Sequence, residues 1–202
     1  MDLEGYPKQL ILKDGTEVSI RPMTKEDGKK LLDFFIRLPK EDRQFLKEDV
    51  SRKEVVQRFV DKLDYDKILP VLAFYDNEIV GDATLHRSDH GWSKHVGEIR
   101  VVVSRQFQKK GLGLALARHL TEKAVDAGLD KMVAEVMDNQ IGGRKAFESL
   151  GFEEEARLKG HVRDIFGHKR DLIIMANDIS HLWEAMEHMI KDYMPSLDGI
   201  HP

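Results

Sequence analysis

Two glutamates, each expected on a strand, are considered first because a carboxylate can act as a base. Glu98 lies in a strand expected over residues 96–103, and Glu135 lies in one expected over residues 132–137. A positioned carboxylate can take a proton from an amine directly or through a water. A lysine amine needs this help, because its unperturbed pKa is about 10.4. Each glutamate also has a plain structural interpretation, Glu98 as a solvated group or a partner of Arg100, and Glu135 as a cross-strand partner of a basic neighbour.

The second stretch that could do chemistry is a glycine-containing loop between a strand and a helix. It comprises Gln108, Lys109, Lys110, Gly111, Leu112 and Gly113, and the predicted helix runs from Gly111 to Gly128. The first N–H groups of a helix lack partners within it, and the positive end of the helix dipole faces the loop. The glycines allow a bulky anion to approach the backbone, and the two lysines add positive charge. The stretch therefore predicts a phosphate or pyrophosphate site.

Three phosphate-binding motifs can be compared with this stretch. A P-loop requires Gly-x-x-x-x-Gly-Lys-Ser/Thr, which the sequence lacks. A dinucleotide fingerprint requires a small residue where this chain has Leu116, and a leucine there would hold the helix away from its strand. The third motif, Gln/Arg-x-x-Gly-x-Gly/Ala, is met at every defining position, so the stretch resembles the pyrophosphate loop of the GNAT N-acetyltransferases, which bind acetyl-CoA. An ordinary strand-turn-helix and a dinucleotide-binding protein are the alternatives.

Hydrophobic periodicity and turn residues predict the element order β-β-α-α-β-β-β-α-β-α-β-β. Asp14-Gly15 marks a first hairpin, Thr24 begins a first helix, and a capping box from Ser51 to Glu54 begins a second. One β-α-β crossover among antiparallel hairpins indicates an α/β (α+β) fold, with a mixed, mostly antiparallel sheet, helices on both faces and a C-terminal helix. The order resembles the GNAT fold over about residues 10–178. We therefore expect an acetyltransferase domain at 8–178 and a helical extension with a tail at 179–202.

The resemblance implies where acetyl-CoA would lie. Its pyrophosphate would rest on the amides of residues 108–113. Its pantetheine arm would pair with the backbone of Val101, Val102 and Val103, in a splay between the strands that carry the two glutamates. An asparagine that the family has after the second of these strands is Asn139, or its place is taken by Gln140.

A narrower resemblance concerns the base and the proton donor. The spacing of Glu98 to the glycine loop, with segments 21–27 and 34–43, looks like the GNAT domain of prokaryotic protein lysine acetyltransferases, which use a glutamate on this strand as the base. Many GNAT enzymes have a tyrosine before a Leu-Gly-Phe sequence, as the acid that protonates the CoA thiolate. Here that position is Phe147. A phenyl ring can pack against the thioester but cannot donate a proton, so water or the ammonium product would have to supply it.

Composition narrows the class of protein. A length of 202 residues, 41% hydrophobic and 34% charged, describes one soluble domain with an appendage, and we expect a cytoplasmic protein with no membrane span. A net charge of −4, with acidic and basic residues intermixed, argues against a nucleic-acid partner. The chain has no cysteine, and its nine histidines lack a compact ligand spacing, so no metal is expected. An apolar stripe from Ile179 to Tyr193 predicts packing on the domain itself, with a homodimer contact as the alternative.

The resemblance implies an N-acetyltransferase that transfers an acetyl group from acetyl-CoA to a primary amine by direct attack. A protein lysine is the favoured acceptor, and a small amine is the alternative. The phenylalanine at position 147 also leaves open a non-catalytic acyl-CoA-binding or regulatory module. We expect the acceptor surface to come from the two N-terminal helices and the loops at 88–94 and 161–167.

Overall fold

A computed structural model describes residues 5–180 of the chain, and its centre is an eight-stranded sheet with the order β1-β2-β3-β4-β5-β6-β8-β7. Every neighbouring pair is antiparallel except β5 and β6, which are parallel. The strands are β1 (Lys8–Ile11), β2 (Glu17–Pro22), β3 (Ile68–Tyr75), β4 (Glu78–Arg87), β5 (Val96–Val103), β6 (Lys131–Met137), β7 (Glu153–Arg163) and β8 (Lys169–Asp178). The helices are α1 (Gly28–Arg37), α2 (Lys40–Arg43), α3 (Lys53–Asp61), α4 (Leu112–Asp126) and α5 (Ile141–Glu148).

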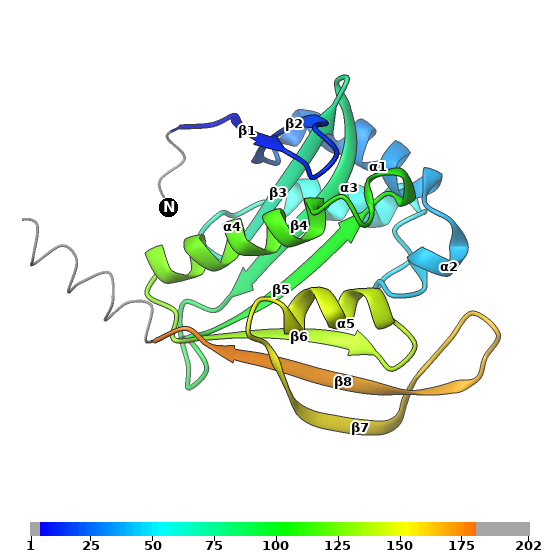
Figure 1. The fold of residues 1–202 in the computed structure, drawn as a ribbon, viewed down its shortest axis with the longest axis vertical. Coiled ribbons are helices and arrows are strands. Elements are labelled where there is room, and N and C mark those ends of the chain that lie inside the picture. The colour runs from blue at the N-terminus through cyan, green and yellow to red at the C-terminus, as the bar shows by residue number, and fades with distance from the viewer. Residues whose placement is uncertain (1–4, 181–202) are drawn as a thin grey trace, which may run out of the picture.

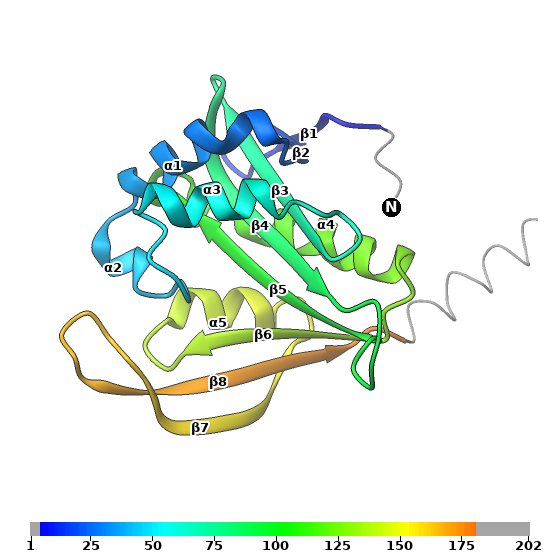
Figure 2. The same cartoon turned by 180° about the vertical axis from the view of Figure 1, so that it is seen from behind.

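Helices cover both faces of the sheet. Helix α4 crosses one face (Figure 1), and α1 and α3 cover the other (Figure 2). Alternate residues of a strand point to opposite faces. On β3, Val71 and Ala73 therefore pack in the core beneath α4, whereas Leu72 and Phe74 pack in a second core beneath α1 and α3. The central strands are buried on both sides, which accounts for their nearly continuous apolar sequence.

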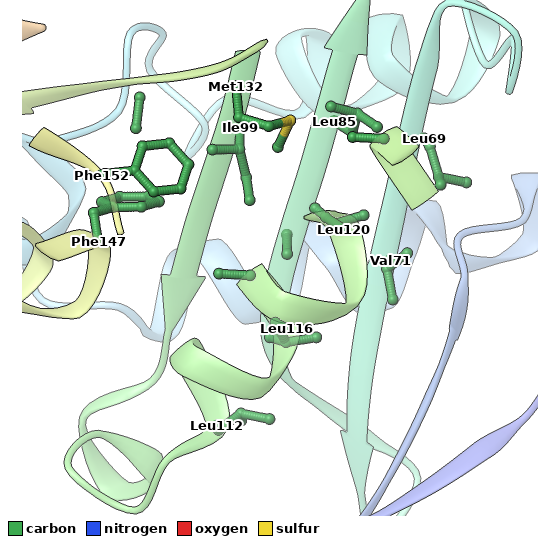
Figure 3. Close-up of a cluster of buried hydrophobic side chains, with 14 of the residues drawn as sticks. Leu69, Val71, Leu85, Ile99, Leu112, Leu116, Leu120, Met132, Phe147 and Phe152 are labelled. Atoms are coloured by element: carbon green, nitrogen blue, oxygen red, sulfur yellow. The ribbon is translucent and has the colours of Figure 1, made fainter. Parts of the chain in front are cut away.

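Helix α4 packs on the sheet through leucines spaced one turn apart. Leu112, Leu116 and Leu120 are fully buried and point to the strands (Figure 3). The large residue at Leu116 is accommodated by a glycine on the strand, since a Cβ atom built on Gly81 would lie 3.1 Å from Leu116 Cδ1. In a dinucleotide-binding fold, a small residue on the helix lets the helix approach the strand closely. Here the small residue is on the strand instead.

The predicted fold class and element order are confirmed, with the addition of the short helix α2 and two 3₁₀ turns. The predicted capping box at the start of α3 is wrong. The N-cap is Arg52, and the Ser51 hydroxyl instead donates to Asp49 Oδ1 at 2.5 Å. The C-terminal helix predicted for about 180–193, with most of its apolar stripe, lies outside the described residues; Ile179 is fully buried. Within residues 5–180, no helix is long and apolar enough to cross a membrane.

Candidate active site

The sheet opens along the line between β5 and β6. Their pairing is limited to three residue pairs and ends where Glu98 faces Val133, after which the two strands diverge (Figures 1 and 2). Among the described residues, the β5 edge from Ile99 to Val103 has no strand partner on the β6 side. Unpaired N–H and C=O groups at such an edge can bind an extended ligand that carries amides. The predicted positions Val101, Val102 and Val103 lie on this edge.

A concave group of backbone amides lies beyond the end of β5, at the start of α4. Lys109 and Gly111 both have positive φ, 61° and 94°, on either side of Lys110. Alternating backbone conformations of this kind direct successive N–H groups to one point and form anion-binding concavities. The first hydrogen bond of α4 runs from Ala115 N–H to Gly111 C=O at 2.9 Å, so three N–H groups before it have no acceptor within the helix.

The β1–β2 hairpin braces this loop and changes its charge. Lys13 N–H donates to Lys110 C=O at 3.0 Å, and Lys110 Nζ lies 2.8 Å from Asp14 Oδ2 and 5.3 Å above the Phe107 ring. The hydrogen bond from Lys110 is the main reason that the pKa of Asp14 is lowered to about 2. The Lys110 ammonium is therefore paired with a carboxylate of the hairpin at the protein surface. Lys109 forms no ion pair within the described part of the chain, and the predicted contact of the two lysines with an anion stays a prediction.

Gln108 has a structural contact of its own. Its side-chain Nε2 donates to Val103 C=O at 3.0 Å, across the turn that joins β5 to α4. This bond satisfies a carbonyl at the strand end and holds the loop against β5. The role of Gln108 in shaping the loop thus stands beside its predicted contact with an anion.

The structure brings the two predicted bases together. Ile99 is buried in the core beneath α4, so Glu98 points to the opposite face of the sheet, and Glu135 lies on that same face. Both carboxylates bind one ammonium group, because Lys47 Nζ lies 2.5 Å from Glu98 Oε1 and 3.0 Å from Glu135 Oε2. Burial alone would lower the pKa of Lys47, but the bonds to the two carboxylates outweigh it and raise that pKa. Sequence reasoning missed Lys47, which lies in a bend with no periodic pattern.

A buried polar group lies next to the glutamates, on β4 and β5. Asp82 is 2% exposed and binds Arg100 Nη2 at 3.4 Å, so Arg100 pairs with this carboxylate and not with Glu98 as the sequence suggested. Burial raises the pKa of Asp82 despite the nearby arginine. His86 faces Glu98 across the β4–β5 ladder, and burial, followed by the charge of Arg100, lowers its pKa. Asp82, Arg100 and His86 are thus the ionisable groups beside Glu98 on these two strands.

A short segment, residues 40–47, which we name the strap, crosses this face of the splay. Asp42 binds Arg105 beyond the end of β5 through two bonds of 3.0 and 3.1 Å. Gln44 Oε1 accepts a bond from the backbone N–H of Ile165, in the β7–β8 turn, at 3.2 Å. The third contact of the strap is the ion pair of Lys47 with the two glutamates. The strap lies beside the β7–β8 turn (Figure 2).

The comparison with known proteins decides the family. The sequence model of the Acetyltransferase (GNAT) family matches residues 32–152, more than half of the chain. This chain belongs to the GNAT family. The GNAT domain of S. lividans PAT is similar in structure, with a TM-score of 0.74 and 19% identity over 88% of this chain and 99% of that one. A GNAT acetyltransferase from Streptococcus pneumoniae has a TM-score of 0.71 and 21% identity over 80% of this chain and 99% of that one.

Curated GNAT relatives match a shorter region. The [ribosomal protein bS18]-alanine N-acetyltransferase of Salmonella typhimurium is 34% identical over 80 residues, which are 40% of this chain and 53% of that protein. The enzyme of the same name from Escherichia coli K12 is 32% identical over the same shares. This chain thus spans about half the length of the curated relatives it matches. A solved structure of Salmonella typhimurium yncA with its cofactor acetyl-CoA has a TM-score of 0.67 and 19% identity over 81% of this chain and 95% of that one.

The remaining predicted positions lie beside β6, at α5. Asn139 Oδ1 is buried and has no hydrogen-bond partner, and Gln140 is the N-cap of α5. Phe147 is 9% exposed, and its ring lies 5.1 Å from the Phe152 ring in the core (Figure 3). Where many GNAT enzymes have a tyrosine, this chain therefore has a ring anchored in apolar surroundings.

The GNAT acyl donor, acetyl-CoA, fits what this chain presents. The amide concavity at Gly111 suits a pyrophosphate, the free β5 edge suits an arm with two amides, and the unpartnered oxygen of Asn139 can accept a ligand N–H. Two shallow surface hollows of about 530 and 510 Å³ lie elsewhere, one by the β1–β2 hairpin and one along α3. Within residues 5–180, no group of three or more His, Asp or Glu side chains could hold a metal ion.

Proposed function

We propose that this chain is an acetyl-CoA-dependent N-acetyltransferase that acetylates a primary amine by direct attack. Two carboxylates, Glu98 and Glu135, already bind an ammonium group at the closed end of the splay. This observation carries the proposal, because a GNAT acceptor must place its amine beside a base and next to the acyl group. We assign residues 8–178 to the acetyltransferase unit and 179–202 to an extension.

The cofactor would lie along β5 in this proposal. Gly113 packs close to Val103, so the pyrophosphate loop adjoins the carboxyl end of the strand. An arm that runs from there along the free edge points toward Glu98, the last β5 residue paired with β6. Acetyl-CoA supplies a thioester whose thiolate is a fair leaving group, since a thiol has an unperturbed pKa of about 8.5. Phe147 would shield this end from water without donating a proton.

Glu98 is the proposed base, and Glu135 is its alternative. Glu98 makes the shorter bond to the ammonium, and it lies on the strand that the arm would follow. Two carboxylates near an amine favour its charged form, which helps binding but opposes loss of the proton. The proton must therefore pass to a carboxylate, directly or through a water, before the amine attacks.

The acceptor we favour is a lysine side chain of a protein. In support of this choice, the Lys47 ammonium, on its long stem, lies between the two carboxylates. The second candidate is the N-terminal amine of a protein, because the curated relatives are named as alanine N-acetyltransferases of a ribosomal protein. An α-amine has an unperturbed pKa near 7.7–8.0, so it needs much less help from a base than a lysine does. A small-molecule amine is the third class.

Calorimetric titration with acetyl-CoA, with NADH as the control ligand, is the first test. Binding of acetyl-CoA alone would support the cofactor assignment, and failure to bind it would overturn the proposed function. Release of CoA thiol would then be measured with three acceptors, namely an N-terminally blocked peptide with one lysine, a lysine-free peptide with a free N-terminal alanine, and a polyamine. Turnover confined to the alanine peptide would contradict the preference for lysine.

A further inference from the structure

Lys47 occupies the position that the proposed reaction requires of its acceptor. Its Nζ atom is within hydrogen-bond distance of both carboxylates, at 2.5 Å from Glu98 and 3.0 Å from Glu135. Direct proton transfer needs about this heavy-atom separation. Of the lysine–carboxylate ion pairs in the described residues, this is the one in which a single ammonium binds two glutamates.

The strap delivers Lys47 to this position from a distance in sequence. Lys47 and Glu98 are 51 residues apart, and the strap that carries the lysine is anchored on both sides of the splay. An amine held on the same chain reacts at a high effective concentration, so a modest intrinsic rate suffices. The Lys47 side chain is 52% exposed, which leaves its amine accessible from solvent as well as from the splay.

We propose that Lys47 is a self-acetylation site of this protein. The proposal rests on the proposed function. In the reaction, the Lys47 ammonium gives one proton to Glu98 or Glu135, and the neutral Nζ attacks the thioester carbonyl carbon of acetyl-CoA. A C–N bond forms, the C–S bond breaks, and the leaving thiolate takes up the remaining proton. The products are Nε-acetyl-Lys47 and free CoA, and no oxidant or further reactant is needed.

Acetylation would change what the strap does at the site. An amide carries no positive charge, so acetyl-Lys47 cannot bind two carboxylates as an ammonium does. Glu98 and Glu135 would then be free to bind the ammonium of an incoming amine. The unmodified lysine thus competes with the external acceptor, and its acetylation removes the competitor.

The test is mass spectrometry of the full chain after incubation with acetyl-CoA, followed by peptide mapping. We expect Lys47 to gain one acetyl group at a rate per molecule that does not change with protein concentration. Lys53→Arg removes an exposed lysine at the start of α3 and is the matched control for Lys47→Arg. The double variant Glu98→Gln/Glu135→Gln should acetylate Lys47 at least about 10²-fold more slowly, the lower end of general-base effects. The rate that remains in the double variant also measures spontaneous acetylation of Lys47 by acetyl-CoA.

A mixing experiment separates reaction within one molecule from reaction between molecules. Protein with Lys47→Ala, which retains its carboxylates and leaves them unoccupied, is mixed with Glu98→Gln/Glu135→Gln, which retains its lysine. Acetylation of the second by the first at the wild-type rate would overturn self-acetylation within one chain. If acetyl-CoA binds and external amines are acetylated while Lys47 stays unmodified, this inference alone fails. If acetyl-CoA does not bind, the proposed function fails with it.

Discussion

Substitution of Gly111 by alanine tests the cofactor loop on which the functional argument depends. Gly111 has a φ of 94°, and an L-residue in the left-handed region costs about 1–2 kcal/mol. The added Cβ would lie 3.4 Å from Lys13 Cγ, on the hairpin whose backbone bonds to Lys110. The loop is therefore expected to relax away from its present conformation. The amides that form the concavity would then point elsewhere.

The expected loss of acetyl-CoA affinity follows from those amides. A hydrogen bond to a charged group contributes about 1.5–3 kcal/mol. Loss of one such bond to the pyrophosphate should weaken binding by about 10- to 100-fold. Stability should fall by about 1–2 kcal/mol at the same time, and the melting temperature by roughly 2–8 °C for a chain of this size.

Gly128→Ala is the matched control at the other end of the same helix. Gly128 also has a positive φ, 72°, and no atom lies within 4 Å of the Cβ it would gain. This variant should lose a similar amount of stability but keep its affinity for acetyl-CoA, because it is far from the loop along α4. Calorimetric titration gives the dissociation constants, and denaturant unfolding gives the stabilities. Equal affinities in the two variants, at equal loss of stability, would refute the pyrophosphate assignment.

Three further predictions concern the base, the ring at α5 and a buried histidine. Glu98→Gln should lower kcat by about 10²- to 10⁴-fold with little change in acetyl-CoA affinity, and Glu135→Gln should lower it less; a larger effect at Glu135, in a thiol-release assay, would exchange their roles. Phe147→Tyr should lower the melting temperature and leave kcat unchanged, because the ring is 9% exposed and packs on Phe152, which leaves the new hydroxyl in apolar surroundings; a rise in kcat would contradict this and place the ring edge at the thioester. Burial lowers the pKa of His119 to about 4, and its Nε2 pairs with the Tyr6 hydroxyl. The unfolded chain therefore binds the proton more readily, and about 2 kcal/mol of stability should be lost between pH 7 and pH 5. Urea unfolding at both pH values checks this, and His119→Gln should remove most of the difference.

The loop proposed to bind the pyrophosphate could be located from the sequence because it is formed by one local segment. A β-branched strand, a turn with glycines and an amphipathic helix follow one another within residues 96–128, and each step has a compositional signal. The sequence also argued against a dinucleotide-binding loop, because Leu116 stands where that motif needs a small residue. The glycine that accommodates Leu116, Gly81, lies on another strand, and no local pattern linked the two.

The acceptor end depends on contacts between segments far apart in the chain, and these carry no sequence period. Lys47 binds Glu98, which is 51 residues away in the sequence, and Glu135, which lies on another strand. Nothing in the composition of the strap specifies either partner. Arg100 illustrates the same difficulty. It lies two residues from Glu98 on the same face of β5, which suggested a pair, but the buried Asp82 binds it instead. The loop proposed to hold the pyrophosphate therefore has a local sequence signal, whereas the contacts around Glu98 and Glu135 are assembled from the strap, two strands and the β7–β8 turn. For this reason, substitutions in the strap and at the two glutamates are the experiments that test which acceptor this chain uses.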